Sequence, residues 1–568
     1  MMHNPDLLAM EHASTSVLSI PAPGADGVAL HLQGSTEQIP LSSPSGNGWW
    51  DIDLRMLDLA DGEYEYDFEV DREGHRRRIA DPYAEELTDG PTTRAVLRMR
   101  QGTRVRPDFS WDGELAAVGL PGNNELVIYE LPMRYPERSG GCATLEGPAR
   151  HEIERTVTRS GVNCIQMLPI QDSPDGRNGG YGTRFFFAPD RAIGSPMAVR
   201  RFIKWCHQRG IRVIMDLVMN HARDCPLRDL AFDWFFLRDG AEEPDQDGNA
   251  RPDWGGDIFR YRAPRGGGYH ARDFQYGVAA YFIEEYHVDG FRVDEFKGID
   301  NYEFVQTFTK RAHAVHEQLF GQQRPFVVIG EDSRRRAAVT SDGGYNGRRV
   351  VDAIWDFCFR HEIRRVVSDS VPEAWVRRLL SVERGGFPDL ASRVVYCTSH
   401  DVTPGEENRL LPYYLERLDG ASGRERMAKD MVRTTFALML TAVGIPMFLA
   451  GEEMGDGRIQ ELIRLRATHP ALHRNELEFL DVRKGERTLA YCRTAGEPLG
   501  TAGQVLVIAN CSGRQYSAVE VAWPWGATPA MAEIGGSGAE MPAVSDRRAS
   551  LPLRPYETRV FALQRASC

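Results

Sequence analysis

Apolar runs that turn polar at one end recur through the middle of the chain. They alternate with stretches whose apolar residues recur at intervals of three and four, the period of an amphipathic helix. The eight runs are residues 125–131, 162–170, 211–221, 288–296, 325–332, 352–357, 392–401 and 443–453. Strands that alternate with helices are typical of parallel sheets, and eight of them predict an α/β fold, the (β/α)8 TIM barrel.

Period-two alternation marks the regions on either side of these runs. In residues 62–71, GEYEYDFEVD, apolar and acidic residues alternate, which predicts a half-buried antiparallel strand. We predict an N-terminal β-sandwich over residues 1–115, a catalytic barrel over 116–475 and a C-terminal β-sandwich over 476–568. The long segment at about 222–275, between the third and fourth runs, is predicted to be an inserted subdomain.

Composition narrows the classes of function. The chain has 568 residues and a formal net charge of −13, whereas a broad nucleic-acid interface needs clustered Lys and Arg. No run approaches the ~18 apolar residues of a membrane span, and the first residues lack the basic start of a signal peptide. The nine scattered cysteines contain no C-x-x-C pair, which favours free thiols in a reducing compartment. We predict a cytoplasmic protein without nucleic-acid or membrane partners, and leave its oligomeric state open.

Polar residues stand where the apolar runs end, which is the catalytic face of a TIM barrel. They are Tyr181 in the second connecting loop, Asp216, Asn220 and His221 at the third run, Arg292 and Asp294 at the fourth, Glu331 at the fifth, and His400 and Asp401 at the seventh. Each taken singly is more often a helix cap or a satisfied polar group than a catalyst. Their joint occurrence at four strand ends of one barrel favours a catalytic site.

Strand alternation separates the charges of the fourth run, YHVDGFRVDEF. If Arg292 points into the barrel, Asp294 does too, and Glu295 faces the helices. A neighbouring guanidinium keeps a carboxylate ionised, which suits Asp294 to act as a nucleophile. Glu331 has no cationic neighbour in the inward register of its own strand, so burial is expected to raise its pKa and suit it to general-acid work. Two carboxyl groups shifted in opposite directions are typical of a retaining glycosidase.

At these positions the chain resembles the α-amylase superfamily of glycoside hydrolases, glycoside hydrolase family 13. DLVMNH (216–221), GFRVDEF (290–296), VIGED (328–332) and TSHD (398–401) resemble four motifs of that family, in the family's order. The N-terminal DGEYEYDFEVD (61–71) is similar to the β-sandwich that precedes the barrel in glycogen branching enzymes and maltooligosyltrehalose trehalohydrolases.

The resemblance implies three catalytic carboxyl groups. Asp294 is expected to be the nucleophile, Glu331 the general acid and then base, and Asp401 a ligand of the sugar hydroxyls. Six further residues are expected to bind or support the sugar: Tyr181, Asp216, Asn220, His221, Arg292 and His400. No organic cofactor is required, because two carboxyl groups suffice for glycosyl transfer. Calcium binding near the third loop is left open, and no residue is assigned as a metal ligand.

The favoured function is retaining cleavage of α-1,4 bonds in starch, glycogen or maltooligosaccharides through a covalent glycosyl-enzyme. A 1,4-α-glucan branching enzyme, which passes the same intermediate to a sugar, and a trehalohydrolase are alternatives. An inactive glycan-binding barrel is a remote one, because the carboxyl groups are intact. Trp49 and Trp50 could stack on a sugar, but packing at a domain interface is favoured.

Overall fold

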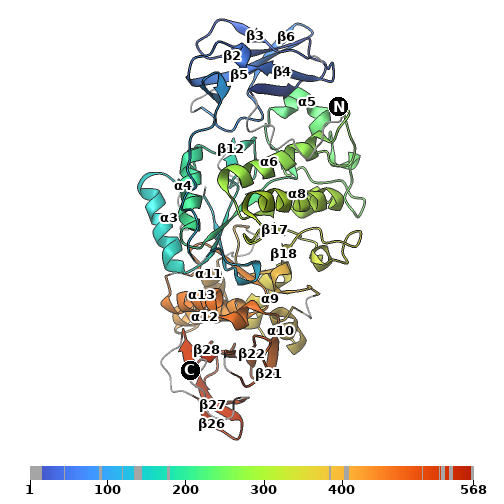
Figure 1. Cartoon of the computed structure of the whole chain (residues 1–568). Coiled ribbons are helices and arrows are strands. Elements are labelled where there is room, and N and C mark those ends of the chain that lie inside the picture. Colours follow the sequence, from blue (N-terminus) through green and yellow to red (C-terminus); the bar gives the residue numbers. More distant parts are fainter. Residues whose placement is uncertain are drawn as a thin grey trace.

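The computed structural model describes most of the chain. The described residues are 16–43, 45–88, 93–117, 119–133, 144–174, 179–382, 386–401, 409–453, 455–501, 503–523, 525, 531–535 and 542–563. The molecule is elongated, with a barrel between N-terminal sheets at one end and C-terminal sheets at the other (Figure 1). In these ranges no helix combines the length and apolarity that a membrane crossing needs.

Eight parallel strands close into a barrel in the order of the sequence. They are β9 (Ile128–Leu131), β10 (Cys164–Met167), β13 (Arg212–Leu217), β16 (Gly290–Val293), β17 (Val327–Gly330), β18 (Ala353–Trp355), β19 (Arg393–Tyr396) and β20 (Ile445–Leu449). Each of the eight apolar runs contains one of these strands, so the TIM-barrel prediction is confirmed.

Helices in the connections cover the outer face of the barrel (Figure 1). They include α3 (Gly147–Ser160), α4 (Pro196–His207), α6 (His270–Tyr286), α8 (Tyr302–Phe320), α9 (Phe357–Ser368), α10 (Glu373–Leu380), α11 (Leu410–Arg417), α12 (Arg424–Thr441) and α13 (Gly457–Thr468). The connection from β17 to β18 is fully described and holds one 3-10 turn, Ala337–Thr340, in place of an α-helix. That stretch is rich in Gly, Asp and Arg and has no apolar period of 3.6.

Side chains alternate between the two faces of the barrel strands. Ile214, Ile329 and Trp355 belong to one buried cluster that fills the interior, while Phe291 and Val293 belong to the larger cluster that includes the helices. In this register Arg292 of the fourth strand points into the barrel, beside its register partner Asp216 on the third strand. Polar groups therefore line the interior near its open end.

Two sheets make up the N-terminal region. β1 (Val17–Pro21) pairs with β4 (Trp49–Asp53), and the second sheet has the order β3-β2-β5-β7-β8, with β6 also paired to β5. Its strands are β2 (Gly27–Leu32), β3 (Gln38–Pro40), β5 (Gly62–Arg72), β6 (His75–Ile79), β7 (Ala95–Arg100) and β8 (Thr103–Arg104). The predicted strand at 62–71 is β5.

Two further sheets form the C-terminal region. One has the order β21-β22-β23-β28-β25 and the other the order β24-β27-β26. The strands are β21 (Leu477–Arg483), β22 (Thr488–Arg493), β23 (Val505–Asn510), β24 (Tyr516–Ala522), β25 (Met531–Ile534), β26 (Ala543–Ser545), β27 (Arg548–Leu553) and β28 (Thr558–Leu563). A separate apolar cluster that includes Leu506, Trp523 and Leu551 joins them. The predicted domain limits stay predictions, and their ends at residues 1 and 568 lie outside the described ranges.

The segment between β13 and α6 contacts both the barrel and the N-terminal sheet. It contains α5 (Leu227–Phe235) and a two-stranded sheet of β14 (His221–Ala222) and β15 (Asp257–Ile258). Trp49 of the N-terminal sheet packs against Trp234 of this segment and His270 at the start of α6, with ring centroids 6.4 and 6.0 Å apart. The indole N–H of Trp50 donates to the carbonyl of Ala22. Trp49 therefore packs between the N-terminal sheet and another region, as favoured from the sequence, whereas the contact of Trp50 lies within the N-terminal region.

Asp289 lies at the opposite end of β16 from the catalytic face and is fully buried. Its carboxylate contacts His207 Nε2 at 2.9 Å, accepts from the Val213 N–H at 2.8 Å, and pairs with Arg324 at 3.1 Å. Burial raises the pKa of Asp289, but His207 and Arg324 outweigh that effect and hold the pKa below its usual range. Asp289 of the YHVDGFRVDEF stretch therefore links the start of β16 to the elements around it.

We expect Asp289→Asn to lower the free energy of unfolding by about 3–5 kcal/mol, because it leaves buried cationic partners without their counter-charge. Urea denaturation followed by circular dichroism measures the change. The control is Asp233→Asn, which breaks an exposed pair with Arg238 and should cost under ~1 kcal/mol. Equal effects of the two substitutions would contradict the structural role given to Asp289.

Candidate active site

A single buried guanidinium organises the barrel mouth. Arg292 Nη1 donates to Asp294 Oδ1 at 2.7 Å and to both carboxylate oxygens of Asp216 at 2.9 Å. Its Nη2 lies 2.7 Å from Glu331 Oε2. The guanidinium carbon stands 4.5 Å from the ring centroid of Trp355. A planar fork with several donors can hold carboxylates on different sides at once, which an ammonium group cannot do in the same geometry.

Asp294 stands just past the end of β16, and its side chain is 12% exposed. Its second oxygen, Oδ2, accepts a hydrogen bond from Asn220 Nδ2 at 3.2 Å. Asn220 Oδ1 in turn contacts His221 Nδ1. Both oxygens of Asp294 are therefore oriented, one by a cation and one by an amide. An oriented, buried carboxylate with some access to solvent suits a nucleophile.

Glu331 carries a raised pKa at the end of β17. Burial is the main cause, and although Arg292 opposes it, the carboxyl groups of Asp401, Asp294 and Glu295 add to the rise. The sequence indicated no cationic neighbour on the same strand, and Arg292 reaches Glu331 from the adjacent strand. The expected direction of the shift nevertheless agrees with the structure. A carboxyl group with a raised pKa is suited to donate its proton to a leaving group.

Glu295 departs from the alternation expected for it. The strand ends at Val293, and Glu295 adopts a left-handed backbone with φ of +41°. Its N–H donates to Glu331 Oε2 at 2.8 Å. Burial, followed by the charge of Asp294, raises the pKa of its carboxyl group to about 7. Glu295 therefore belongs to the surroundings of the acid, rather than to the helix side of the barrel.

Tyr181 connects the third strand to the seventh. Its hydroxyl donates to Asp216 Oδ2 at 2.7 Å, and its ring stacks on the imidazole of His400 with centroids 4.9 Å apart. Burial, assisted by Asp294, raises the pKa of Asp216 to about 7 against the opposing effect of Arg292. Asp216 thus orients both the arginine and the tyrosine.

His400 stands between two carboxylates. Its Nδ1 lies 2.8 Å from Glu130 Oε1 and its Nε2 lies 3.1 Å from Asp401 Oδ1. Burial lowers the pKa of His400, but Asp401 and Glu130 outweigh that and raise it well above the usual value. Burial raises the pKa of Asp401, and the charge of His400 reverses this and holds it below the usual range. The Asp401 side chain is 44% exposed, so it can reach a ligand.

The structure links all nine predicted site residues through direct contacts. Arg292 contacts four of them, Asn220 joins His221 to Asp294, and Tyr181 joins the group to His400 and Asp401. Two participants were missed: Glu130 on β9 and Trp355 on β18. Glu130 carried a usable signal, because it is a charged residue inside an apolar run, as Arg292 is. Trp355 carried none, because a tryptophan at a strand end is ordinary core.

The acidic side chains of the third loop do not fit a calcium site. Five of them pair with an arginine: Asp224 with Arg228, Asp229 with Arg77, Asp233 with Arg238, and Asp245 and Asp247 with Arg334. Guanidinium groups thus satisfy the oxygens that calcium would need. Within the described ranges no group of three or more His, Cys, Asp or Glu could hold a metal ion.

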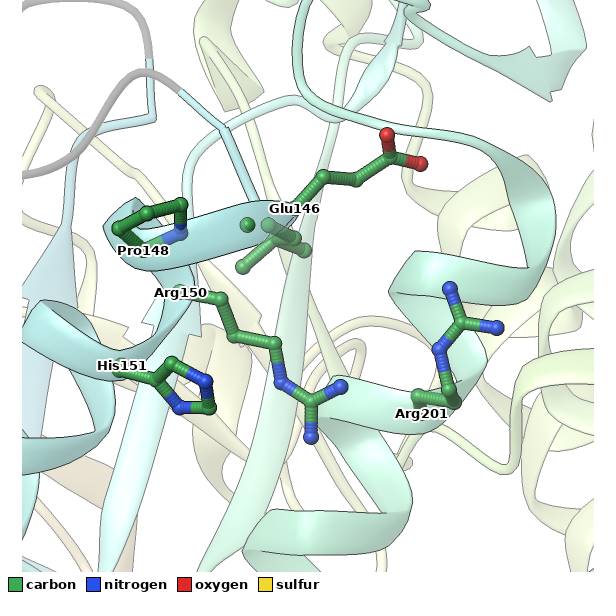
Figure 2. Close-up of a pocket in the computed structure, with 7 residues that line it drawn as sticks. Glu146, Pro148, Arg150, His151 and Arg201 are labelled. Atoms are coloured by element: carbon green, nitrogen blue, oxygen red, sulfur yellow. The ribbon is translucent and has the colours of Figure 1, made fainter.

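A separate hollow lies outside the barrel mouth, between the start of α3 and the side of α4. It has a volume of about 590 Å³, and its lining includes Glu146, Arg150, His151 and Arg201. Figure 2 shows the charged ends of these side chains around it. Glu146 accepts hydrogen bonds from the N–H and hydroxyl of Ser195, and Arg150 donates to Glu154. None of the nine site residues lines this hollow, so it is distinct from the candidate active site.

Comparison with known proteins gives both sequence and structural relatives. Residues 157–260 match the family described as alpha amylase, catalytic domain. The 1,4-α-glucan branching enzyme of Corynebacterium efficiens is 31% identical over 48% of this chain and 35% of its own length. That of Marinobacter nauticus is 24% identical over 77% of this chain and 74% of its own. The matched part of the chain thus spans about a third of the first relative.

Solved structures share the fold over almost the whole chain. Pullulanase from Paenibacillus barengoltzii, solved with maltohexaose and α-cyclodextrin, superimposes with a TM-score of 0.72 at 20% identity, over 97% of this chain and 94% of its own. An α-amylase from Anoxybacillus gives a TM-score of 0.62 at 20% identity, over 79% of this chain and 100% of its own. With the family match and the four motifs at the ends of β13, β16, β17 and β19, the chain is similar to the α-amylase family.

Proposed function

We propose that the protein is a retaining enzyme that acts on α-glucans, with Asp294 as nucleophile and Glu331 as general acid and base. One observation carries the proposal: the guanidinium of Arg292 holds Asp294 and Glu331 together, while burial keeps the pKa of Glu331 raised. Because both carboxyl groups contact one guanidinium, they are held close together, as a double-displacement mechanism requires.

The proposed reaction has two halves. Asp294 attacks the anomeric carbon and forms an ester with the sugar, while Glu331 gives its proton to the departing oxygen. Glu331 then takes a proton from the incoming acceptor, whose oxygen attacks the anomeric carbon and breaks its bond to Asp294. Asp401 and the cationic His400 supply an acceptor and a donor for sugar hydroxyls, and Tyr181 supplies an aromatic face. These steps need no cofactor.

The first candidate reaction is hydrolysis of α-1,4 bonds in starch, glycogen or maltooligosaccharides, with water as the acceptor. The second is 1,4-α-glucan branching, with a sugar hydroxyl as the acceptor. The name shared by the sequence relatives favours the second. The same carboxyl groups serve both reactions, so the shape of the surrounding loops decides whether water or a sugar hydroxyl is the acceptor. An α-glucan partner and a cytoplasmic location remain part of the proposal, and release of trehalose is a further alternative.

Product analysis separates the candidate reactions. The protein is incubated with amylose, maltoheptaose, pullulan and maltooligosyltrehalose, and the products are resolved by chain length and linkage. Hydrolysis should release new reducing ends and shorter α-1,4 chains. New α-1,6 branches without reducing ends would instead establish branching, and release of trehalose would establish the third reaction. Absence of any product from all four substrates would contradict the proposal.

The nucleophile assignment is tested on two adjacent carboxyl groups. We expect Asp294→Asn to lower turnover by about 10⁴-fold or more, because an amide cannot form the glycosyl ester. Glu295→Gln is the matched control, since its main-chain contact to Glu331 is retained, and it should stay within about tenfold of the parent. Turnover of a radiolabelled or chromogenic maltooligosaccharide measures both. An active Asp294→Asn protein would refute the assignment.

The raised pKa of Glu331 also predicts a pH effect on stability. Its carboxyl group binds a proton more tightly in the folded protein than in the unfolded chain. Stability is therefore lost as the pH rises from the unfolded value of about 4.3 through the folded value. Because glutamine cannot titrate, Glu331→Gln should narrow the difference in Tm between about pH 5 and about pH 8.

Differential scanning fluorimetry at both pH values measures that difference. The control is Glu303→Gln, whose parent side chain is 65% exposed and which should leave the difference unchanged. A difference that is the same in the parent and in Glu331→Gln would show that Glu331 is not held protonated by its surroundings.

A further inference from the structure

Glu130 is a charged side chain inside the first strand of the barrel. It lies on β9 and has no exposed surface. Its neighbours in the sheet are Gln166 on β10 and Leu449 on β20, and neither of them carries a charge. A buried carboxylate is stable only when a cation or several hydrogen-bond donors face it. The position of Glu130 therefore requires a partner from outside these two strands.

His400, which follows the end of β19, supplies that partner. Its main-chain N–H donates to Glu130 Oε2 at 2.6 Å, and its ring nitrogen Nδ1 lies 2.8 Å from Glu130 Oε1. Across the described ranges, no other cationic side chain forms an ion pair with Glu130. One carboxylate thus fixes the backbone and the ring of His400 together.

The second ring nitrogen of His400 faces another carboxylate. Nε2 lies 3.1 Å from Asp401 Oδ1, and an ionised carboxylate can only accept hydrogen bonds. Each ring nitrogen must therefore carry a proton, which makes the imidazole a cation. Loss of the charge at Glu130 would leave only Asp401 in contact with that cation. Arg292 and Arg360 also act on the charge of Asp401.

Few other titratable groups lie beside this ring. Among the described residues, Asp216 at the end of β13 acts on it without contact, and the ring of Tyr181 stacks on it with centroids 4.9 Å apart. Burial lowers the pKa of His400, and Asp401 and Glu130 together outweigh that effect. The protonation of His400 therefore depends on the two carboxylates that touch it.

We propose that Glu130 is a positioning residue for the proposed glycosyl transfer, which holds the ring of His400 toward Asp401 and keeps both ring nitrogens protonated. The ring then offers a donor to sugar hydroxyls and keeps Asp401 ionised as their acceptor. Glu130 is too deeply buried to contact the sugar, so it acts only through His400. The kinetic part of this inference rests on the proposed function, whereas the protonation of His400 is measured without substrate.

NMR on the full-length protein with isotope-labelled histidine measures that protonation, and His400→Gln identifies the signal by its loss. We expect the ring of the parent to keep both protons up to about pH 8, above the ordinary midpoint of about 6.5. Glu130→Gln keeps the length of the side chain and an oxygen that accepts, but it removes the charge. It should move the midpoint of His400 down by about one pH unit or more.

Glu453→Gln is the matched control. The parent carboxyl group of Glu453 is also buried, and it accepts a hydrogen bond at 3.0 Å from the hydroxyl of Tyr129, the neighbour of Glu130 on β9. The signal of His400 should not move in this variant. Glu130→Asp, which retains the charge, should keep the midpoint closer to that of the parent than Glu130→Gln does.

Turnover of maltoheptaose is then followed across the same pH range. In Glu130→Gln, kcat/KM should fall about tenfold more at about pH 8 than at about pH 6, because a neutral His400 lacks one donor. The proposal would be overturned by an unmoved His400 signal in Glu130→Gln, by a parent ring that titrates near its ordinary value, or by a moved signal with an unchanged pH profile. A moved signal without turnover in the parent would support the hold of Glu130 on His400 and count against the proposed function instead.

Discussion

The arrangement of the barrel mouth depends on one buried cation. Arg292 is fully buried, and its neighbours are the carboxyl groups of Asp216, Asp294 and Glu331. A guanidinium in such a place is stable only when it is paired, and the carboxylates around it could not gather without it. Trp355 covers one face of the guanidinium plane and excludes water from it. The interaction therefore fixes the positions of residues from three strands at once.

Carboxyl groups outnumber cations in this site, and that imbalance determines which carboxyl groups have raised pKa values. Asp401 stays ionised because His400 beside it is cationic, whereas Glu331, Asp216 and Glu295 have raised pKa values. One cluster thus contains a carboxylate that holds a negative charge and a carboxylic acid that holds a proton. This division arises from burial and from neighbours, because all the groups are chemically alike.

The two aspartates at opposite ends of β16, Asp289 and Asp294, have different roles. Asp289 is fully paired by His207, Arg324 and a main-chain N–H, with no exposure to solvent. Asp294 is equally well oriented but retains an exposed edge. The N-terminal sheet, through Trp49, packs against the segment that carries Trp234, and the same segment carries a turn beside His221. The walls of the mouth are thus supported from outside the barrel.

The sequence alone determined the barrel, because apolar runs that alternate with amphipathic helices fold as the strands of a parallel sheet. It also determined which residues stand at the strand ends, since period-two alternation places Arg292 and Asp294 on one face. Alternation could not show that Arg292 also reaches Glu331, or that Glu295 turns back toward the acid. Those contacts cross from one strand to the next or follow the end of a strand, where the period no longer applies. Tertiary structure also brought in Glu130 and Trp355, because their roles exist only once distant strands lie side by side.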